Sequence, residues 1–200
     1  MKKGNVSIAS LRLDKDYRIG EAKDTLYGDF HQTSPEGLPF YRPESPLSGP
    51  SGFRQDYIDE INRYNMGIIR FPGGSNMCFY NWKDGIGPRE ERIARVYYIG
   101  GQPDKMLVGL DECFELARLM GAKVMLDIRA GFASASLTEL YDELEYCLGK
   151  GGTYWSDKRI ANGHKEPYEI PYICIGNEED GPWEFAQHTP ESYGHFAREA

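Results

Sequence analysis

Short apolar runs alternate with segments of helical spacing along the chain. Four runs predict buried or half-buried strands, and they span residues 26–30, 67–71, 123–129 and 172–178. Apolar residues three or four positions apart predict a helix after each strand. These helices span residues 54–65, 110–120 and 136–148, with a last helix that begins at Thr189 and Pro190. Ser136 and Glu139 have the spacing of a capping box, so the third helix is the clearest of the four.

The repeated order of strand and helix predicts parallel βαβ units. No GxGxxG or GxxxxGK[ST] pattern follows a strand, which argues against a nucleotide-binding doubly wound sheet. Long loops follow the first two strands, at residues 31–52 and 72–108. Long loops at the C-terminal ends of strands build the sites of barrel enzymes. We therefore expect an α/β fold that comprises the first four βα units of a (β/α)8 TIM barrel.

Four units make half of a closed barrel, and a half barrel has two unpaired sheet edges and an open core. We expect a partial barrel that belongs to a longer chain, with completion by a second copy as the alternative. Residues 149–169 are expected to be a glycine-rich connection. A loosely alternating strand over residues 6–13 is expected to pair with something outside the chain. We therefore divide the chain into an N-terminal strand region, 1–20, and a half barrel, 21–200.

Charge and hydropathy exclude several classes of partner. The formal net charge is −8, and the basic residues are scattered, which argues against a nucleic-acid partner. No apolar run approaches the roughly 20 residues of a membrane span. No apolar segment follows the first three residues either, so we expect neither a membrane partner nor a leader, and a cytoplasmic location.

The cysteines and histidines lack the spacing of metal sites. They contain no CxxC pair and no HExxH motif; the residues are Cys78, Cys113, Cys147, Cys174, His31, His164, His188 and His195. We expect reduced, buried thiols, no metal and no cofactor.

Polar residues at the ends of the predicted strands are the candidates for chemistry. They are Gln32, Arg70, Ser75, Asn76, Asp127, Arg129, Asn177 and Glu178. Glu178 is followed by Glu179 and Asp180, and like charges together with burial favour the protonated carboxyl that a proton donor needs. A solvated acidic turn is the alternative. Tyr154, Trp155 and Trp183 lie in predicted glycine-rich loops, where each could be a loop anchor or a platform for a sugar ring.

Four longer motifs carry a resemblance to a known family. They are RFPGG at 70–74, YNWKDGIGP at 80–88, GGTYW at 151–155 and GNEEDGPW at 176–183. In this order they resemble the motifs of family 51 of the glycoside hydrolases, which are mainly intracellular α-L-arabinofuranosidases. The resemblance runs from about residue 6 to residue 200. It implies a retaining exo-glycosidase that removes terminal α-L-arabinofuranosyl residues from plant-derived oligosaccharides, and a strand at 6–13 that belongs to an accessory β-sandwich.

The resemblance also implies roles for single residues. Glu178 would be the general acid/base, Asn177 would bind the 2-hydroxyl of the sugar, and Trp183 would lie on the leaving-group side. Arg70 would belong to the substrate site as well. The nucleophile of the family is a Glu at the end of the seventh barrel strand, so it would lie beyond residue 200, and this chain alone would be inactive. Relatives commonly form hexamers, which implies a homo-oligomer.

Two positions depart from the family pattern and bear on the sugar that is bound. Gln32 stands where the family usually has Glu, and Ser75 where it usually has Asn; both positions hold the arabinofuranose ring. Loss of a carboxylate acceptor costs roughly 1.5–3 kcal/mol of binding. A glycosidase for a different sugar, and a non-catalytic sugar-binding or assembly relative, are therefore the alternatives.

Overall fold

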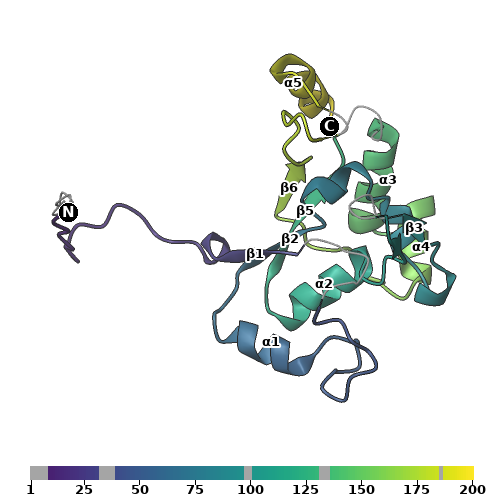
Figure 1. The fold of residues 1–200 in the computed structure, drawn as a ribbon, viewed down its shortest axis with the longest axis horizontal. Helices are drawn as coiled ribbons and strands as arrows, with labels where there is room; N and C mark the ends of the chain where they lie inside the picture. Colours follow the sequence, from purple (N-terminus) through teal and green to yellow (C-terminus); the bar gives the residue numbers. More distant parts are fainter. Residues whose placement is uncertain (1–8, 32–38, 97–100, 131–135, 185–186) are drawn as a thin grey trace, which may run out of the picture.

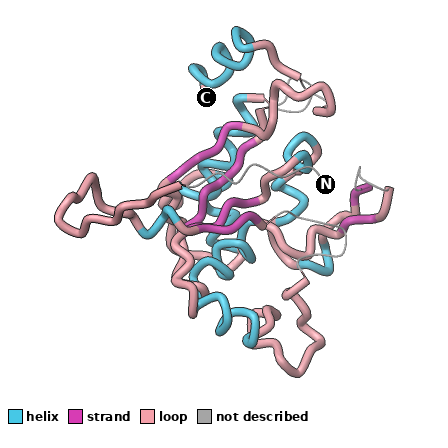
Figure 2. Tube along the Cα trace, turned by 60° about the vertical axis from the view of Figure 1, so that its left-hand side comes forward, coloured by secondary structure: helices cyan, strands magenta, loops and turns pink. Residues whose placement is uncertain are grey.

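Four parallel strands form the central sheet of the computed structural model, which describes residues 9–31, 39–96, 101–130, 136–184 and 187–200. The strands are β1 (Gly28–Phe30), β2 (Ile68–Phe71), β5 (Lys123–Ile128) and β6 (Tyr172–Ile175), and they pair in that order. Every pairing is parallel; Figure 1 labels the four strands, and Figure 2 shows them side by side. The predicted parallel sheet is confirmed.

The first strand is shorter than predicted because residues Asp24–Leu26 form a 3-10 turn, η1. Two glycines let this turn and strand lie against β2. A Cβ atom on Gly28 would lie 2.5 Å from Cγ2 of Ile68, and a Cβ atom on Gly67 would lie 2.1 Å from the carbonyl oxygen of Asp24. A larger residue at either position would push the edge of the sheet outward.

A helix follows each strand of the sheet. The helices are α1 (Gln55–Asn62), α2 (Leu110–Leu119), α3 (Leu137–Leu148) and α5 (Pro190–Glu199). Two predicted N-caps are confirmed. Ser136 Oγ accepts a hydrogen bond from the backbone N–H of Glu139 over 3.1 Å, and Thr189 Oγ1 accepts one from that of Ser192 over 3.2 Å. These bonds satisfy N–H groups that have no partner within the helix.

The two faces of the sheet differ in burial. Ile69, Phe71, Val124 and Leu126 lie on one face and are at most 1% exposed, because α2 packs against β2 and β5 there. The strand register places Phe30, Arg70 and Met125 on the opposite face, where all three are exposed or only partly buried. One side of the sheet is therefore a packed core, and the other is open in these residues.

The glycine-rich stretch 149–169 contains a helix that the sequence analysis missed. Helix α4 (Tyr154–Ala161) packs along α3, as Figure 1 shows. Its anchor is Arg159, which is 0% exposed and donates to the carbonyl oxygens of Tyr146 and His164 over 2.7 and 2.9 Å. A buried arginine does not produce an apolar stripe, so the hydrophobic pattern gave no signal for this helix.

Tyr154 and Trp155 are therefore helical residues, and their assignment to a loop was wrong. The Trp155 ring lies 4.8 Å from that of Trp82 in an edge-on contact, at the margin of the core. Tyr154 is 73% exposed. Trp155 therefore belongs to the packing of α4.

The second long loop is more structured than predicted. Its described residues contain three 3-10 turns and a two-stranded antiparallel sheet: η2 (Ser75–Cys78), η3 (Trp82–Gly85), η4 (Arg89–Glu91), β3 (Arg95–Val96) and β4 (Pro103–Asp104). Met77, Tyr80 and Trp82 from this segment are at most 3% exposed. The segment thus contributes to the core as well as to the end of the sheet.

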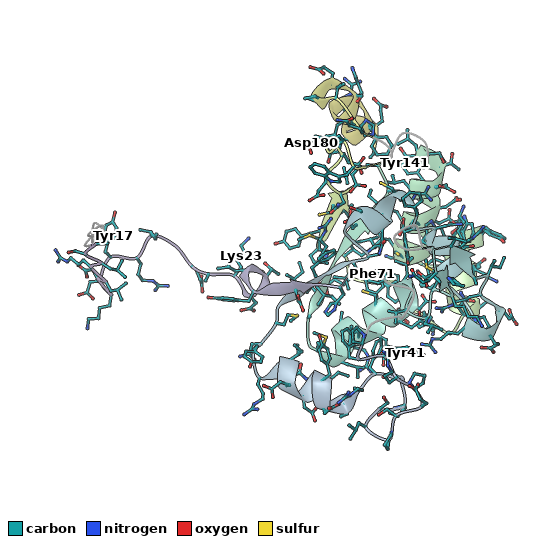
Figure 3. All side chains as sticks on the ribbon, in the orientation of Figure 1. Tyr17, Lys23, Tyr41, Phe71, Tyr141 and Asp180 are labelled. Carbon is teal, nitrogen blue, oxygen red and sulfur yellow. The ribbon has the colours of Figure 1, made fainter. Side chains whose placement is uncertain are left out.

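Residues 9–20 form no helix or strand and extend away from the sheet, as Figure 1 and the position of Tyr17 in Figure 3 show. The strand predicted over 6–13 is absent over residues 9–13, and its first three residues lie outside the described ranges. Leu11 and Leu13 are 85% and 87% exposed. An extended strand needs a neighbour for its backbone hydrogen bonds, and the described residues provide none here.

The cysteine prediction is confirmed for three of four positions. All four cysteines are in the thiol form; Cys78, Cys113 and Cys147 are buried, and Cys174 on the open face is half-buried. In the ranges described above, no helix is long and apolar enough to cross a membrane.

Candidate active site

Three polar side chains from adjacent strands meet at the C-terminal end of the sheet. Arg70 is at the third position of β2, Asp127 is at the fifth position of β5, and Asn177 follows β6 by two residues. Arg70 Nη2 donates to Oδ2 of Asp127 and, over 3.0 Å, to Oδ1 of Asn177. Parallel register brings these strand ends together. Two of the candidate side chains at strand ends, Arg70 and Asn177, therefore lie together.

The bond from Arg70 orients the amide of Asn177. A guanidinium only donates, so the amide oxygen must face it and the NH2 group faces away. Asn177 therefore presents a donor to anything that binds beyond the sheet. The Arg70 guanidinium itself lies over the Phe30 ring, 5.2 Å from its centroid, which restricts its movement.

Asp127 is the buried carboxyl beneath this pair, with no exposed surface. Burial raises its pKa to about 7, and the nearby Arg70 charge opposes that rise. Its Oδ1 atom has no hydrogen-bond partner among the described residues. The Asp127 carboxyl thus holds Arg70 in place, although its removal from water is energetically unfavourable.

Glu178 lies directly after Asn177 and has an unusual backbone. Its φ angle is 50°, a left-handed conformation that residues other than glycine rarely adopt. Such strain costs on the order of 1–3 kcal/mol and is concentrated at functional sites. Trp183 Nε1 donates to Oε2 of Glu178 over 2.8 Å. The carboxyl of Glu178 is thus directed by both its backbone and a neighbouring indole.

The expected burial of Glu178 is not found. Its side chain is exposed, and the buried carboxyl of the GNEEDGPW segment is Glu179 instead. Burial raises the pKa of Glu179, and its Oε1 accepts from the backbone N–H of Asn177 over 3.2 Å. The chain turns here, because Gly176 and Glu178 have left-handed φ angles of 74° and 50°, and this turn directs the two neighbouring carboxyls to different sides. Figure 3 shows Asp180 beyond the end of β6, on the side of α5.

The turn after β2 brings Ser75 to the same end of the sheet. Gly73 and Gly74 have φ angles of 54° and 66°, and a Cβ atom on Gly73 would lie 2.1 Å from the Phe30 ring. Only glycine fits this turn. Ser75 follows at the start of η2 and is half-buried.

Glu184 is a site residue that the sequence analysis missed. It is 5% exposed, and its carboxylate accepts from Ser75 Oγ over 2.5 Å and from Cys78 Sγ over 3.0 Å. It lies one residue beyond the motif that ends at Trp183. The available signal was an acidic residue directly after an aromatic motif, but its partners are more than 100 residues away in the sequence.

Two further candidate residues from the strand ends are Gln32 and Arg129. Gln32 lies outside the described residues, although the backbone N–H of its neighbour His31 donates to the carbonyl of Arg70 over 3.0 Å. Arg129 does not join Arg70 and Asn177. It donates instead to the carbonyl oxygen of Tyr80 over 3.2 Å, near the buried Glu143, whose pKa is raised to about 8 by burial.

Comparison with known proteins gives a consistent family assignment. The sequence profile of the alpha-L-arabinofuranosidase 1 domain matches residues 60–198. The intracellular exo-α-(1→5)-L-arabinofuranosidase of Halalkalibacterium halodurans is 36% identical over 196 residues, which cover 96% of this chain and 38% of that protein. The enzyme of the same description (number 1) from Bacillus subtilis is 35% identical over 193 residues, which cover 96% and 38% of the two chains.

Solved structures agree with this family assignment. The family 51 α-L-arabinofuranosidase AbfB of Bifidobacterium longum superposes with a TM-score of 0.83 at 36% identity, over 88% of this chain and 34% of that one. The α-L-arabinofuranosidase of Thermotoga maritima, solved as an arabinose complex, gives a TM-score of 0.81 at 36% identity, over 86% and 36% of the chains. This chain therefore spans little more than a third of the length of these relatives.

Proposed function

This chain belongs to family 51 of the glycoside hydrolases, the α-L-arabinofuranosidases, and from that membership we propose the activity of the protein that contains it. The protein is a retaining exo-glycosidase that removes terminal α-L-arabinofuranosyl residues from plant-derived oligosaccharides. The observation that carries this proposal is the bond from Arg70 to Asn177, because it fixes the Asn177-Glu178 pair at the C-terminal end of the sheet. The proposal includes action inside the cell, where the named relatives act.

Glu178 is the proton donor in this proposal. Its carboxyl gives a proton to the glycosidic oxygen as the bond to the sugar breaks, and a second carboxylate attacks the sugar carbon from the opposite side. In the second step Glu178 takes a proton from water, and that water releases the sugar with its configuration retained. Trp183, which donates to Glu178, holds the carboxyl in one orientation for both steps.

The open face of the sheet supports a longer catalytic domain. Phe30, Met125 and Cys174 are left exposed or only partly buried on that face, as half of a closed barrel would leave them. We propose that four further βα units complete the barrel and that the end of the seventh strand supplies the nucleophile. In retaining enzymes the two carboxyl groups stand about 5–5.5 Å apart.

Asn177 is the donor to the sugar in this proposal. With its oxygen bonded to Arg70, its NH2 group is free to bind a hydroxyl next to the reacting carbon. Such a bond strengthens as charge develops in the transition state. Arg70 contributes through the orientation of Asn177.

The test is a panel of p-nitrophenyl glycosides given to the full-length protein: α-L-arabinofuranoside, α-L-arabinopyranoside, β-D-xylopyranoside and β-D-galactopyranoside. We expect the arabinofuranoside to be cleaved with the highest kcat/KM and the released sugar to keep its configuration by NMR. Turnover of another sugar only would overturn the specificity. Binding of arabinofuranosides without any turnover would indicate a non-catalytic relative.

A further inference from the structure

The contact between Glu184 and Ser75 joins two loops of the site. Ser75 is on the loop after β2, and Glu184 is on the loop after β6, in the same segment as Glu178 and Trp183. One residue, Trp183, bonds to Glu178, and the next, Glu184, bonds to Ser75. The two loops are therefore held by adjacent residues of one short segment.

The carboxylate of Glu184 is buried and both of its oxygens accept a hydrogen bond. Oε1 accepts from Ser75 Oγ over 2.5 Å, and Oε2 accepts from Cys78 Sγ over 3.0 Å. A buried carboxylate needs such donors, because an unpaired buried charge is strongly unfavourable. Hydrogen bonds to an ionised acceptor are also shorter and stronger than neutral ones. The hydroxyl hydrogen of Ser75 is therefore used in the hydrogen bond to Glu184.

The bond to Glu184 determines which kind of hydrogen bond Ser75 can form with a ligand. A hydroxyl has one donor hydrogen and two acceptor lone pairs. With its hydrogen on Glu184, Ser75 Oγ can only accept. Ser75 remains half-buried rather than buried, which leaves part of this residue within reach of a ligand.

We propose that Glu184 is a positioning residue that makes Ser75 an obligate hydrogen-bond acceptor. The part of the site next to Ser75 then selects a sugar with a hydroxyl that donates to Ser75 Oγ. The inference rests on the proposed function, because it assigns this part of the site to the sugar that is released. Asn177 presents a donor and Ser75 an acceptor. The site therefore distinguishes the orientation of hydroxyl groups at two points of the ring.

The test compares sugars in which one hydroxyl is replaced by fluorine, which cannot donate. Methyl α-L-arabinofuranoside and its 2-, 3- and 5-deoxyfluoro analogues are titrated by calorimetry into the full-length protein with Glu178→Gln, so that turnover is slow. At one ring position we expect fluorine to weaken binding on the order of tenfold, the worth of about one hydrogen bond. With Ser75→Ala we expect that loss to shrink to about threefold or less.

The role of Glu184 is tested through the ratio of the affinities for the hydroxyl and the fluoro sugar. Glu184→Leu frees the Ser75 proton to donate, so we expect the ratio of hydroxyl to fluoro affinities to fall toward that of Ser75→Ala. In the Ser75→Ala background Glu184→Leu should change the ratio no further, which a general structural role would not produce. Glu184→Met, which keeps the length of the side chain but has no oxygen to accept from Ser75, serves if the leucine variant does not fold. Glu191→Leu, at an exposed position of α5, is the control and should keep the original ratio.

The outcomes separate this inference from the proposed function. If the full-length protein cleaves arabinofuranosides but the ratio is the same with and without Ser75, the inference is wrong and the function stands. If Glu184→Leu and Ser75→Ala act additively on the ratio, Glu184 does not act through Ser75 and the inference is also wrong. A protein that binds none of the four arabinofuranosides would overturn both.

Discussion

The guanidinium of Arg70 donates a hydrogen bond to Oδ1 of Asn177 over 3.0 Å, although 107 residues separate the two in the sequence. The same nitrogen donates to Asp127 on the strand between them. One cation therefore connects three adjacent strands at the C-terminal end of the sheet, next to Glu178. Its replacement should affect both stability and the site.

Arg70→Met removes the only cation that the described residues place on the fully buried Asp127. We expect the full-length protein to lose about 3–5 kcal/mol of unfolding free energy, because a buried charge is left without its partner. The measurement is urea denaturation followed by tryptophan fluorescence. Arg70→Met with Asp127→Leu should recover much of the loss, since no buried charge remains. Equal destabilisation of the single and double variants would contradict this account.

Glu178→Gln in the full-length protein keeps the size of the side chain and removes the titrating proton. Cleavage of substrates with poor leaving groups should fall roughly 10²–10⁴-fold, the usual worth of general acid catalysis. Activated aryl substrates need little protonation, so their first step should survive and the glycosyl-enzyme should accumulate. Added azide needs no base and should restore turnover, with a glycosyl azide of retained configuration as product.

The control for that variant is Glu191→Gln, at an exposed position in the first turn of α5. It makes the same chemical change and should leave kcat/KM unaltered. An unchanged rate for Glu178→Gln on natural oligosaccharides would mean that the GNEEDGPW segment is a solvated acidic turn.

The isolated 200-residue chain should have no glycosidase activity. The reaction needs an acid and a nucleophile on opposite sides of one bond, and in our proposal the nucleophile lies beyond residue 200. The measurement is release of p-nitrophenol from the α-L-arabinofuranoside by the purified chain, with the full-length protein as the positive control. Turnover that survives purification and disappears with Glu178→Gln would refute the proposed division of the site.

Glu143→Gln should change how stability depends on pH. The pKa of Glu143 is raised by burial from 4.5 to about 8, so the folded state keeps a proton that the unfolded state releases between those values. Stability therefore falls as pH rises from about 4.5 to about 8. Glutamine does not titrate, so the variant should be more stable than the parent at pH 8, on the order of 2–4 kcal/mol.

The measurement for Glu143 is the free energy of unfolding of both proteins at pH 5, 6.5 and 8. Asp127 titrates in the same window, but it is present in both proteins and largely cancels in the difference. Glu191→Gln serves again as the exposed control and should follow the parent at every pH. A difference between Glu143→Gln and the parent that stays constant with pH would show that Glu143 does not titrate in this window.

Hydrophobic periodicity was sufficient for the elements that carry an apolar stripe or run. Helix α3, with its cap at Ser136, and the buried strands β2 and β5 follow from side-chain spacing alone, because burial on one face imposes that spacing. Helix α4 could not be predicted in this way, since it is held by the buried Arg159 and its hydrogen bonds to backbone carbonyls. Polar anchoring leaves no periodic trace in a sequence.

The sequence by itself determined the family, the order of the βα units and the residues that could do chemistry, because these depend on local spacing and on motifs that are contiguous along the chain. Only the tertiary structure decided how those residues are paired. It placed Arg70 on Asn177, buried Glu179 rather than Glu178, and brought Glu184 to Ser75. Hydrogen bonds between loops that are 100 residues apart depend on the register of the sheet and on which side of a turn faces inward, and neither can be read from spacing along one chain.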